Sequence, residues 1–350
     1  MKLLHAADLH LGSKLDSVFP KAIADKRRAE VRASFQRMIE YAEENGISVI
    51  LLAGDVFDSD TPTLKDKDFF KSAVKAHPDI DFLYLRGNHD KADFGETIDN
   101  LKTFSSVWTS YTYGDVVVTG LERSEENASS YYTSLSLDPE KTNIVMLHGQ
   151  IESADGPDSI SLFKLRDKNI DYLALGHIHS YAVHKLDARG NAVYAGCLEG
   201  RGFDETGEKG FVLVDTDREI KHTFISFSRQ PIDKVTLDLS GIDTLYDVIE
   251  TAKAAITDRS AIYRIELVGR SAITDLKEKD IESALSPYCA FVSVKSYVKK
   301  TIDIHAYDGD LSLLGEFVRG VWASEDYTDE EKTEIILYGL KALRGEEVES

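Results

Sequence analysis

The chain has 350 residues, of which 42% are hydrophobic and 29% are charged, so its composition is that of an ordinary globular protein. It contains no apolar run long enough to cross a bilayer and opens on no secretory signal, which argues against a membrane protein and predicts a cytoplasmic one. The formal net charge of −20 argues against a protein that coats nucleic acid non-specifically, because such binding depends on basic side chains.

This length predicts one large domain and one smaller domain, because a single core rarely grows beyond about 250 residues. Cys197 and Cys289 lie far apart and match no metal-binding or disulfide spacing, which suits a reducing compartment. Charge is distributed unevenly, since residues 301–350 hold 13 acidic and 4 basic side chains, whereas residues 21–37 hold six basic and two acidic ones. The basic stretch could contact nucleic acid, or it could be the solvated face of a helix.

The first part of the chain alternates strand and helix patterns. After an apolar opening run, apolar residues repeat at helical spacing from position 31 to 42, and Gly46 supplies a stop. We expect further helices near 62–77 and 159–168. Short apolar runs bounded by polar residues or glycine predict strands buried on both faces at 49–53, 82–85, 144–147, 172–175 and 193–195. These elements predict an α/β fold, in which ligand-binding loops follow the ends of the strands.

The pattern changes at residues 228–231, a polar segment ending in proline that predicts a domain boundary. Beyond it, strand and helix periodicities alternate and predict a small α+β unit. Two amphipathic helices follow in the acidic tail, the second opening on a capping box at 328–331. We therefore divide the chain into a large α/β domain (1–230), an α+β capping domain (231–305) and an acidic helical segment (306–350).

Five polar clusters end apolar runs in order along the large domain: Asp8-Leu9-His10, Gly54-Asp55-Val56-Phe57-Asp58, Gly87-Asn88-His89-Asp90, His148-Gly149 and Gly176-His177-Ile178-His179. Such groups are costly to bury unless they are paired or bound to a metal. Two ions about 3.5 to 4 Å apart can clamp the attacking and leaving oxygens of a displacement at phosphorus. The five clusters together therefore predict a two-metal phosphoesterase site, although a histidine such as His148 alone could be a satisfied core residue.

Asp55 is the best candidate for a ligand that bridges both ions, because it ends a strand directly after a glycine that allows a close backbone turn. The pattern D-x-H, G-D-x-x-D, G-N-H-D, H and G-H-x-H resembles that of the calcineurin-like metallophosphoesterase superfamily over about residues 1–200. The resemblance implies a layered α/β sandwich that holds two divalent ions. One ion would be held by Asp8, His10, Asp55 and His179, and the other by Asp55, Asn88, His148 and His177.

The same resemblance leaves His89 without a metal, beside the scissile phosphate. An imidazole there suits a general acid for the leaving oxygen, or a cationic stabiliser of the transition state. Asp58 could orient the His89 ring, or it could cap the turn that follows it. Arg86 could reach a substrate phosphate, or it could pair with a nearby acid.

Residues 3–12 and 53–58 are similar to the SbcD class of DNA repair exonucleases, and residues 194–211 to its shorter YhaO branch. The resemblance implies a DNA exonuclease with a capping domain, a coiled-coil ATPase partner of the SbcC type and a homodimer. It implies manganese, although mixed oxygen and nitrogen ligands also suit iron or zinc. The main alternative is a phosphodiesterase or phosphatase acting on nucleotides or small phosphoesters. A regulatory subunit with a vestigial metal site is a third reading, which the intact ligand set argues against.

Overall fold

The computed structural model describes residues 1–88, 90, 92, 94–124, 127, 130–151, 158–273, 276–343 and 345. The chain forms a larger unit, Met1–Ile232, and a smaller unit, Asp233–Ser350. Each unit has buried hydrophobic clusters of its own. Among these described residues, no helix combines the length and the apolar character needed to span a membrane.

Two six-stranded sheets pack face to face in the larger unit. The first has the order β14 (Lys221–Ser226), β13 (Gly210–Asp215), β1 (Lys2–Ala6), β2 (Val49–Ala53), β3 (Asp81–Leu85) and β4 (Leu101–Thr103). The second has the order β11 (Ala182–Lys185), β12 (Asn191–Tyr194), β10 (Tyr172–Gly176), β7 (Thr142–His148), β6 (Val116–Gly120) and β5 (Thr109–Tyr113). The central strands β1, β2 and β3 are parallel, as are β6, β7, β10 and β12.

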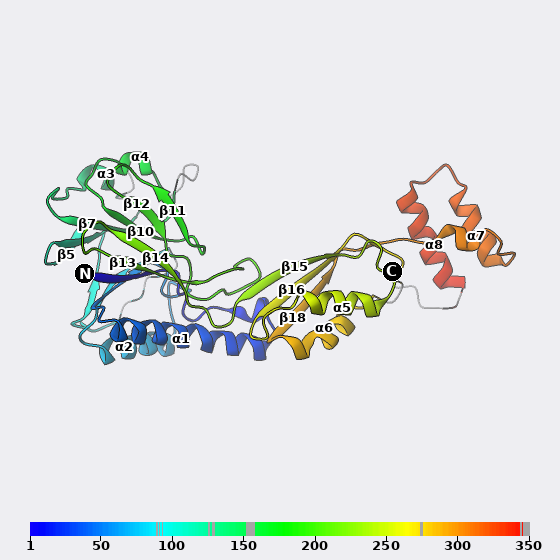
Figure 1. Cartoon of the computed structure of the whole chain (residues 1–350), viewed down its shortest axis with the longest axis horizontal. Helices are drawn as coiled ribbons and strands as arrows, with labels where there is room; N and C mark the ends of the chain where they lie inside the picture. Colours follow the sequence, from blue (N-terminus) through cyan, green and yellow to red (C-terminus); the bar gives the residue numbers. More distant parts are fainter. Residues whose placement is uncertain are drawn as a thin grey trace. The chain divides into compact units, whose positions relative to one another are not determined.

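Helices cover both outer faces of this sandwich. They are α1 (Lys21–Glu44), α2 (Leu64–Ala76), α3 (Tyr131–Ser134) and α4 (Leu162–Leu165). Figure 1 shows α1 and α2 along one side of the larger unit, and α3 and α4 on the opposite side. The predicted layered α/β sandwich is therefore confirmed. The expected helix at 159–168 is shorter than predicted, because Ser159–Ile160 is extended as β9 and pairs with β8 (Gln150–Ile151).

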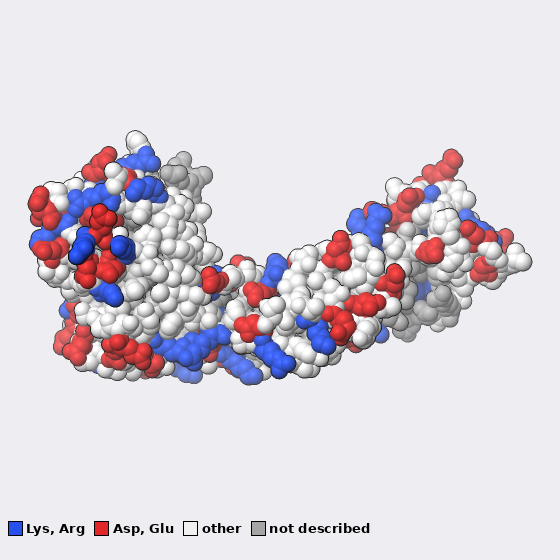
Figure 2. Space-filling view, viewed as in Figure 1, with Lys and Arg blue, Asp and Glu red and all other residues white. Residues whose placement is uncertain are grey.

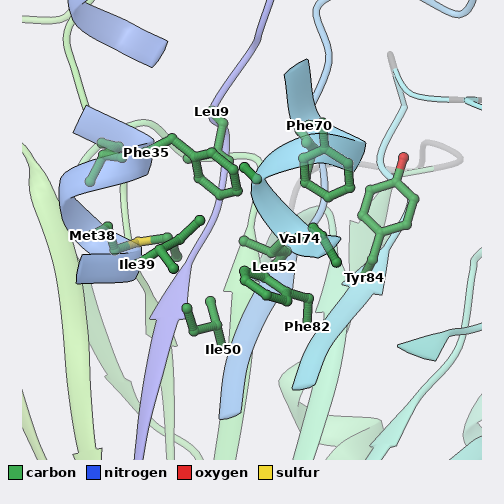
Figure 3. Packing of buried hydrophobic residues seen from close by; sticks show 14 of the residues in the cluster. Leu9, Phe35, Met38, Ile39, Ile50, Leu52, Phe70, Val74, Phe82 and Tyr84 are labelled. Carbon is green, nitrogen blue, oxygen red and sulfur yellow. The ribbon is translucent and has the colours of Figure 1, made fainter. Parts of the chain in front are cut away.

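The central strands are buried on both faces because alternate side chains enter two different cores. Val49 and Leu51 of β2 pack with residues of the second sheet, whereas Ile50 and Leu52 pack with α1 and α2. Figure 3 shows the second of these cores, where Phe70 of α2 lies among aromatic rings. Its neighbours include Phe57, two residues beyond the predicted ligand Asp55 in sequence, so the core also supports the site loop.

Replacing Phe70 with alanine should lower the free energy of unfolding of the larger unit by about 4 kcal/mol. Phe70 is fully buried, and its ring contacts the rings of Phe35, Phe57, Tyr84 and Phe94, so truncation would leave a cavity. Urea unfolding followed by circular dichroism measures the change. The matched control is Phe163→Ala, whose ring is 75% exposed and whose loss should change stability by no more than about 0.5 kcal/mol. Equal losses in the two variants would contradict the expectation.

The basic stretch at residues 21–37 lies on α1, and Figure 2 shows basic side chains along this side of the larger unit. All four of its arginines form ion pairs within the unit: Arg27 with Glu199, Arg28 with Asp16 and Asp25, Arg32 with Asp66, and Arg37 with Glu30 and Glu199. Lys21 and Lys26 are exposed. Most of this positive charge is therefore paired within the unit, and Arg27, which is fully buried, does not belong to a solvated helix face.

The smaller unit contains a three-stranded sheet of β15 (Ile232–Asp238), β16 (Ile262–Val268) and β18 (Phe291–Ser296), packed with α5 (Leu245–Ala255) and α6 (Glu278–Leu285). The short strands β17 (Arg270–Ser271) and β19 (Lys299–Lys300) pair with each other. Two further helices follow, α7 (Leu313–Trp322) and α8 (Asp329–Leu343). The predicted capping box is confirmed, since Thr328 N–H donates to Glu331 at 2.8 Å and Glu331 N–H donates to the Thr328 hydroxyl at 3.3 Å. Short 3₁₀ turns lie at Leu15–Ser17, Ser286–Tyr288 and Ile304–Tyr307.

Candidate active site

The predicted ligands lie at the carboxyl ends of parallel strands in both sheets. Asp8 and His10 follow β1, and Asp55 follows its parallel neighbour β2. His148 ends β7, and His177 directly follows β10, which is parallel to β7. Backbone N–H groups of Asp8 and His10 donate to carbonyls of the loop after β2 at 3.0 and 2.9 Å. The strand order therefore brings residues far apart in sequence to one end of the sandwich.

Two glycines of the polar clusters are required because the side chains of predicted ligands pass directly over them. A Cβ atom at Gly54 would lie 2.1 Å from Nδ1 of His148, and the φ of Gly54 is +95°. A Cβ atom at Gly87 would lie 2.1 Å from Oδ1 of Asp55. Any larger residue would displace the side chains of His148 or Asp55, so the glycines belong to the architecture of the site.

The backbone at the predicted ligands adopts conformations that are rare outside glycine. Among the described residues, six non-glycine positions have positive φ, and four of them are Asp8 (52°), His10 (46°), Asp55 (48°) and His177 (103°). Each such conformation costs on the order of 1 to 3 kcal/mol and persists only where surrounding structure enforces it. This clustering at one place indicates that the fold gives up stability to aim these side chains.

Two groups of potential ligands share a carboxylate. Asp8, His10 and His179 form one group and Asp8, Asp55 and His148 the other, with the ligand atoms of each group within 4.8 Å of one another. The Nε2 atoms of His10 and His179 are 3.2 Å apart. Oδ2 of Asp55 lies 3.8 Å from Nε2 of His10 and 3.4 Å from Nε2 of His148. Asp55, a member of the second group, therefore also lies near His10 of the first, and Asp8 belongs to both groups.

Three predicted site residues remain: His177, Asn88 and His89. The backbone N–H of His177 donates to both carboxylate oxygens of Asp8 at 3.0 Å, and its ring meets the His148 ring edge to face, with centroids 5.4 Å apart. Asn88 is half-buried and follows Gly87, the residue over which Asp55 passes. His89 lies outside the described residues.

These residues fit a metal centre by their burial and their chemistry. Asp8, His10, Asp55 and His148 are between 1% and 4% exposed, and two carboxylates buried so close together need compensating positive charge. Nε2 of His148 is buried and has no hydrogen-bond partner in the described part of the chain, although it faces Asp55. Mixed carboxylate and imidazole donors suit manganese, iron or zinc.

Charge crowding shifts several pKa values in the site. Burial raises the pKa of the Asp8 carboxyl. Burial alone would lower the pKa of His148, but Asp55 and Asp8 outweigh it and raise that pKa to about 9. Burial and the neighbouring His148 lower the pKa of His177. In the metal-free protein, His148 therefore carries the positive charge that the two carboxylates require.

Mn²⁺ binding at the predicted ligand His148 should release this proton, because a histidine binds a metal only as the neutral imidazole. With a His148 pKa of about 9 in the metal-free protein, the apparent Mn²⁺ affinity should rise about tenfold per pH unit from pH 6.5 towards 9 and level off above it. The metal-free protein should lose stability over the same range, since a raised histidine pKa stabilises the fold only while the group is protonated. Titration calorimetry in buffers of different ionisation enthalpy measures the proton release, and pH-independent binding would contradict the assignment.

A second layer of polar side chains lies behind two of the histidines. Nδ1 of His10 is 3.0 Å from Oδ1 of Asp58, and Nδ1 of His179 is 2.7 Å from Oε1 of Glu205. Arg201 donates to both of these carboxylates. Burial alone would raise the pKa of Glu205, but hydrogen bonds from His179 and Arg201 outweigh it and hold that pKa well below its usual range. Arg201 and Glu205 were not singled out from the sequence, since neither belongs to a polar cluster.

Two interpretations that the sequence left open can be compared with these contacts. Asp58 contacts His10 and Arg201, and the N-cap of α2 is Thr63, so Asp58 does not cap that helix. Its predicted contact with His89 falls on a residue outside the described set. Nη2 of Arg86 lies 2.8 Å from Oε2 of Glu122, which favours an ion pair within the fold over contact with a substrate phosphate.

Comparisons with known proteins agree with this arrangement. The calcineurin-like phosphoesterase family matches residues 1–181. An uncharacterized metallophosphoesterase of Bacillus subtilis, YhaO, is 29% identical over 295 residues, covering 77% of this chain and 71% of that protein. DNA double-strand break repair proteins named Mre11 are similar at lower identity. That of Sulfurisphaera tokodaii is 25% identical over 82% of this chain and 79% of its own length, and that of Sulfolobus acidocaldarius is 24% identical over 96% and 94%.

The family match covers more than half of the chain and includes the strand ends that carry all nine predicted site residues. A metal centre explains why buried carboxylates and imidazoles converge at this end of the sandwich. The chain belongs to the calcineurin-like phosphoesterase family, whose members are phosphoester hydrolases with a dinuclear metal centre.

Proposed function

We propose that the chain is a metal-dependent DNA exonuclease that hydrolyses phosphodiester bonds by a two-metal mechanism and acts in DNA repair. The observation that carries the proposal is the position of Asp55, whose Oδ2 lies between His10 and His148 and thus between two groups of potential ligands. The similarity to Mre11 proteins, which extends over most of this chain, supports DNA as the substrate.

In this proposal the described residues divide into two sets of ligands. Asp8, His10 and His179 hold one ion together with Asp55, which also serves the second ion with Asn88, His148 and His177. Two bound ions, of which manganese is the first choice and iron or zinc are alternatives, would polarise the phosphoryl oxygens and stabilise charge in the transition state.

We propose that His89 donates a proton to the leaving oxygen. The backbone N–H of His177, by donating to both oxygens of Asp8, fixes the carboxylate that the two ligand groups share. Asp58 fixes the ring of His10 from its far side. The chain's own residues thus hold the reacting groups in place and deliver the proton.

The proposal extends to domain organisation and partners. Residues 1–230 would be the nuclease domain, 231–305 the capping domain and 306–350 the helical segment. A coiled-coil ATPase of the SbcC type and a second copy of the chain are the proposed partners. A cytoplasmic location is part of the proposal, since Cys197 and Cys289 are free thiols and Cys197 is buried.

A phosphodiesterase or phosphatase acting on nucleotides or small phosphoesters is the second candidate. The net charge of −20 and the pairing of the arginines on α1 favour it, because neither feature attracts a polyanion. It would use the same ligands and the same proton donor. The two candidates therefore differ in substrate and not in chemistry.

The purified full chain, loaded with Mn²⁺, should release nucleotides from end-labelled single-stranded or duplex DNA, alone or with its ATPase partner. Cyclic nucleotides and model phosphodiesters are compared in parallel. Turnover of the small substrates with both DNA forms left intact would replace the nuclease by the second candidate. No hydrolysis of any phosphoester by a chain that binds two ions would overturn both.

A further inference from the structure

Arg201 joins the two carboxylates that lie behind the rings of His10 and His179. Its Nη1 donates to Oδ1 of Asp58 at 2.7 Å, and its Nη2 donates to Oε1 of Glu205 at 2.7 Å. We propose that Arg201 is a positioning residue, which holds these carboxylates so that both histidine rings present Nε2 to one metal ion. The inference rests on the proposed function, because it concerns one of the two ions of that site.

The carboxylates decide which nitrogen of each ring can bind a metal. A carboxylate only accepts hydrogen bonds, so the 2.7 Å hydrogen bond of His179 with Oε1 of Glu205 places the proton on Nδ1 of that ring, and Nη2 of Arg201, 3.2 Å from the same nitrogen, donates to Glu205 instead. Nδ1 of His10 lies 3.0 Å from Oδ1 of Asp58 in an ion-pair contact, whose negative charge favours the proton on that side of the ring. The lone pair then lies on Nε2. The two Nε2 atoms are 3.2 Å apart, so they converge on one point. Carboxylate–histidine pairs of this kind orient metal ligands in many proteins.

Only an arginine can serve both carboxylates at once from this position. Arg201 is 17% exposed and Glu205 is 7% exposed, so neither charge is compensated by bulk water. The backbone N–H of Arg201 also donates to Oε2 of Glu205 at 2.8 Å. The planar guanidinium directs separate N–H groups at two acceptors, whereas a lysine ammonium is a single point charge. Without Arg201, Asp58 and Glu205 would lose the group that fixes their separation.

The backbone that carries Arg201 is itself held rigidly. The carbonyl of Gly200 accepts a hydrogen bond from Nε of Arg27 at 2.7 Å, and Arg27 is fully buried in α1. A Cβ atom at Gly200 would lie 2.7 Å from the carbonyl oxygen of Glu205, so the turn is closely packed. The guanidinium of Arg201 is therefore placed by the core of the unit and not by a flexible surface loop.

The second ligand group does not depend on Arg201. Nδ1 of His148 faces the backbone carbonyl of Ala53 at 2.9 Å, which fixes that ring without any carboxylate. Asp8, which belongs to both groups, is held by the N–H of His177. Loss of Arg201 should therefore weaken the ion held by His10 and His179, and leave the other ion unchanged.

The test is calorimetric titration of the metal-free full chain with Mn²⁺, in wild type and Arg201→Met. Wild type should bind two ions per chain. Arg201→Met should bind one of them about 10- to 100-fold more weakly and the other with unchanged affinity. The matched control is Arg189→Met, because Arg189 also makes a two-pronged contact with one carboxylate, Asp171, but lies on the surface. Arg189→Met should bind both ions as wild type does.

Arg201→Lys keeps the charge and gives the same comparison if the methionine variant fails to fold. It should weaken the same single ion, because a lysine cannot hold both carboxylates. Wild-type affinity for both ions in the folded variants, or an equal loss for both ions, would overturn the inference even if activity falls. A wild type that binds two ions but hydrolyses no phosphoester would overturn the proposed function alone, and the titrations would still decide the role of Arg201.

Discussion

Asp55→Asn is expected to lower kcat/KM for phosphodiester hydrolysis by about 10³-fold or more, equivalent to about 4 kcal/mol of transition-state stabilisation. Oδ2 of Asp55 lies 3.8 Å from His10 and 3.4 Å from His148, so it is placed to serve both ions. An amide keeps the shape of the side chain but loses the negative charge that a shared ligand needs. Metal content should fall from two ions to one or fewer per chain.

The measurements are metal content by elemental analysis and initial rates on DNA and on a model phosphodiester. Asp66→Asn is the matched control, because Asp66 is also buried at 4% exposure and ion-paired, with Arg32 at 2.6 Å, but belongs to neither ligand group. That variant should keep two ions and near wild-type rates, although it should lose some stability. Two ions and full activity in Asp55→Asn would rule out a bridging role.

Much of the larger unit could be predicted because its elements are locally specified. The residues that recur at helical spacing from position 31 to 42 all face the core along α1. Each predicted strand corresponds to an apolar run buried on both faces, as in β2, where all five residues are buried. Strand β5 of the β5–β6 hairpin is hard to predict, because its sequence is Thr-Ser-Tyr-Thr-Tyr and its residues are only partly buried or exposed at a sheet edge, whereas β6 is a mostly buried apolar run that could have been predicted.

The convergence of the predicted ligands could be expected for a related reason. They follow the ends of strands, and parallel strands bring their carboxyl ends to one side whatever the spacing in sequence. The structure adds that Asp8 belongs to both groups, whereas Asp55 belongs to one group and lies 3.8 Å from His10 of the other. The positions of these two carboxylates depend on side-chain directions set by positive φ angles at Asp8 and Asp55, which no local sequence pattern predicts.

The second layer could not be predicted, because its members have no common spacing. Arg201 meets Asp58 across 143 positions of sequence, and this contact exists only because β2 and β12 end at the same side of the sandwich. The pairing of the basic stretch on α1 could not be predicted for the same reason. Its charge was visible in the sequence, but the acids that neutralise it, such as Asp66 and Glu199, come from distant elements.

His89→Gln is expected to separate chemistry from metal binding. Its sequence neighbour Asp90 is buried and accepts hydrogen bonds from the N–H of Val56 and the hydroxyl of Tyr84, so the chain just after His89 is fixed beside the loop of Asp55. Loss of a general acid typically lowers kcat by about 10²- to 10⁴-fold. The metal content should stay at two ions per chain, in contrast to Asp55→Asn.

The leaving group decides between the two roles that the sequence leaves open for His89. A nitrophenolate leaves without a proton, so a general acid matters less for a nitrophenyl phosphodiester than for DNA, whose leaving oxygen is a poor one. A much smaller loss on the nitrophenyl substrate would assign proton donation, whereas equal losses would assign cationic stabilisation of the transition state. His184→Gln, at an exposed position of β11, is the control and should leave both rates unchanged. Full activity of His89→Gln on DNA would remove His89 from the reaction, and the proton would then have to come from solvent.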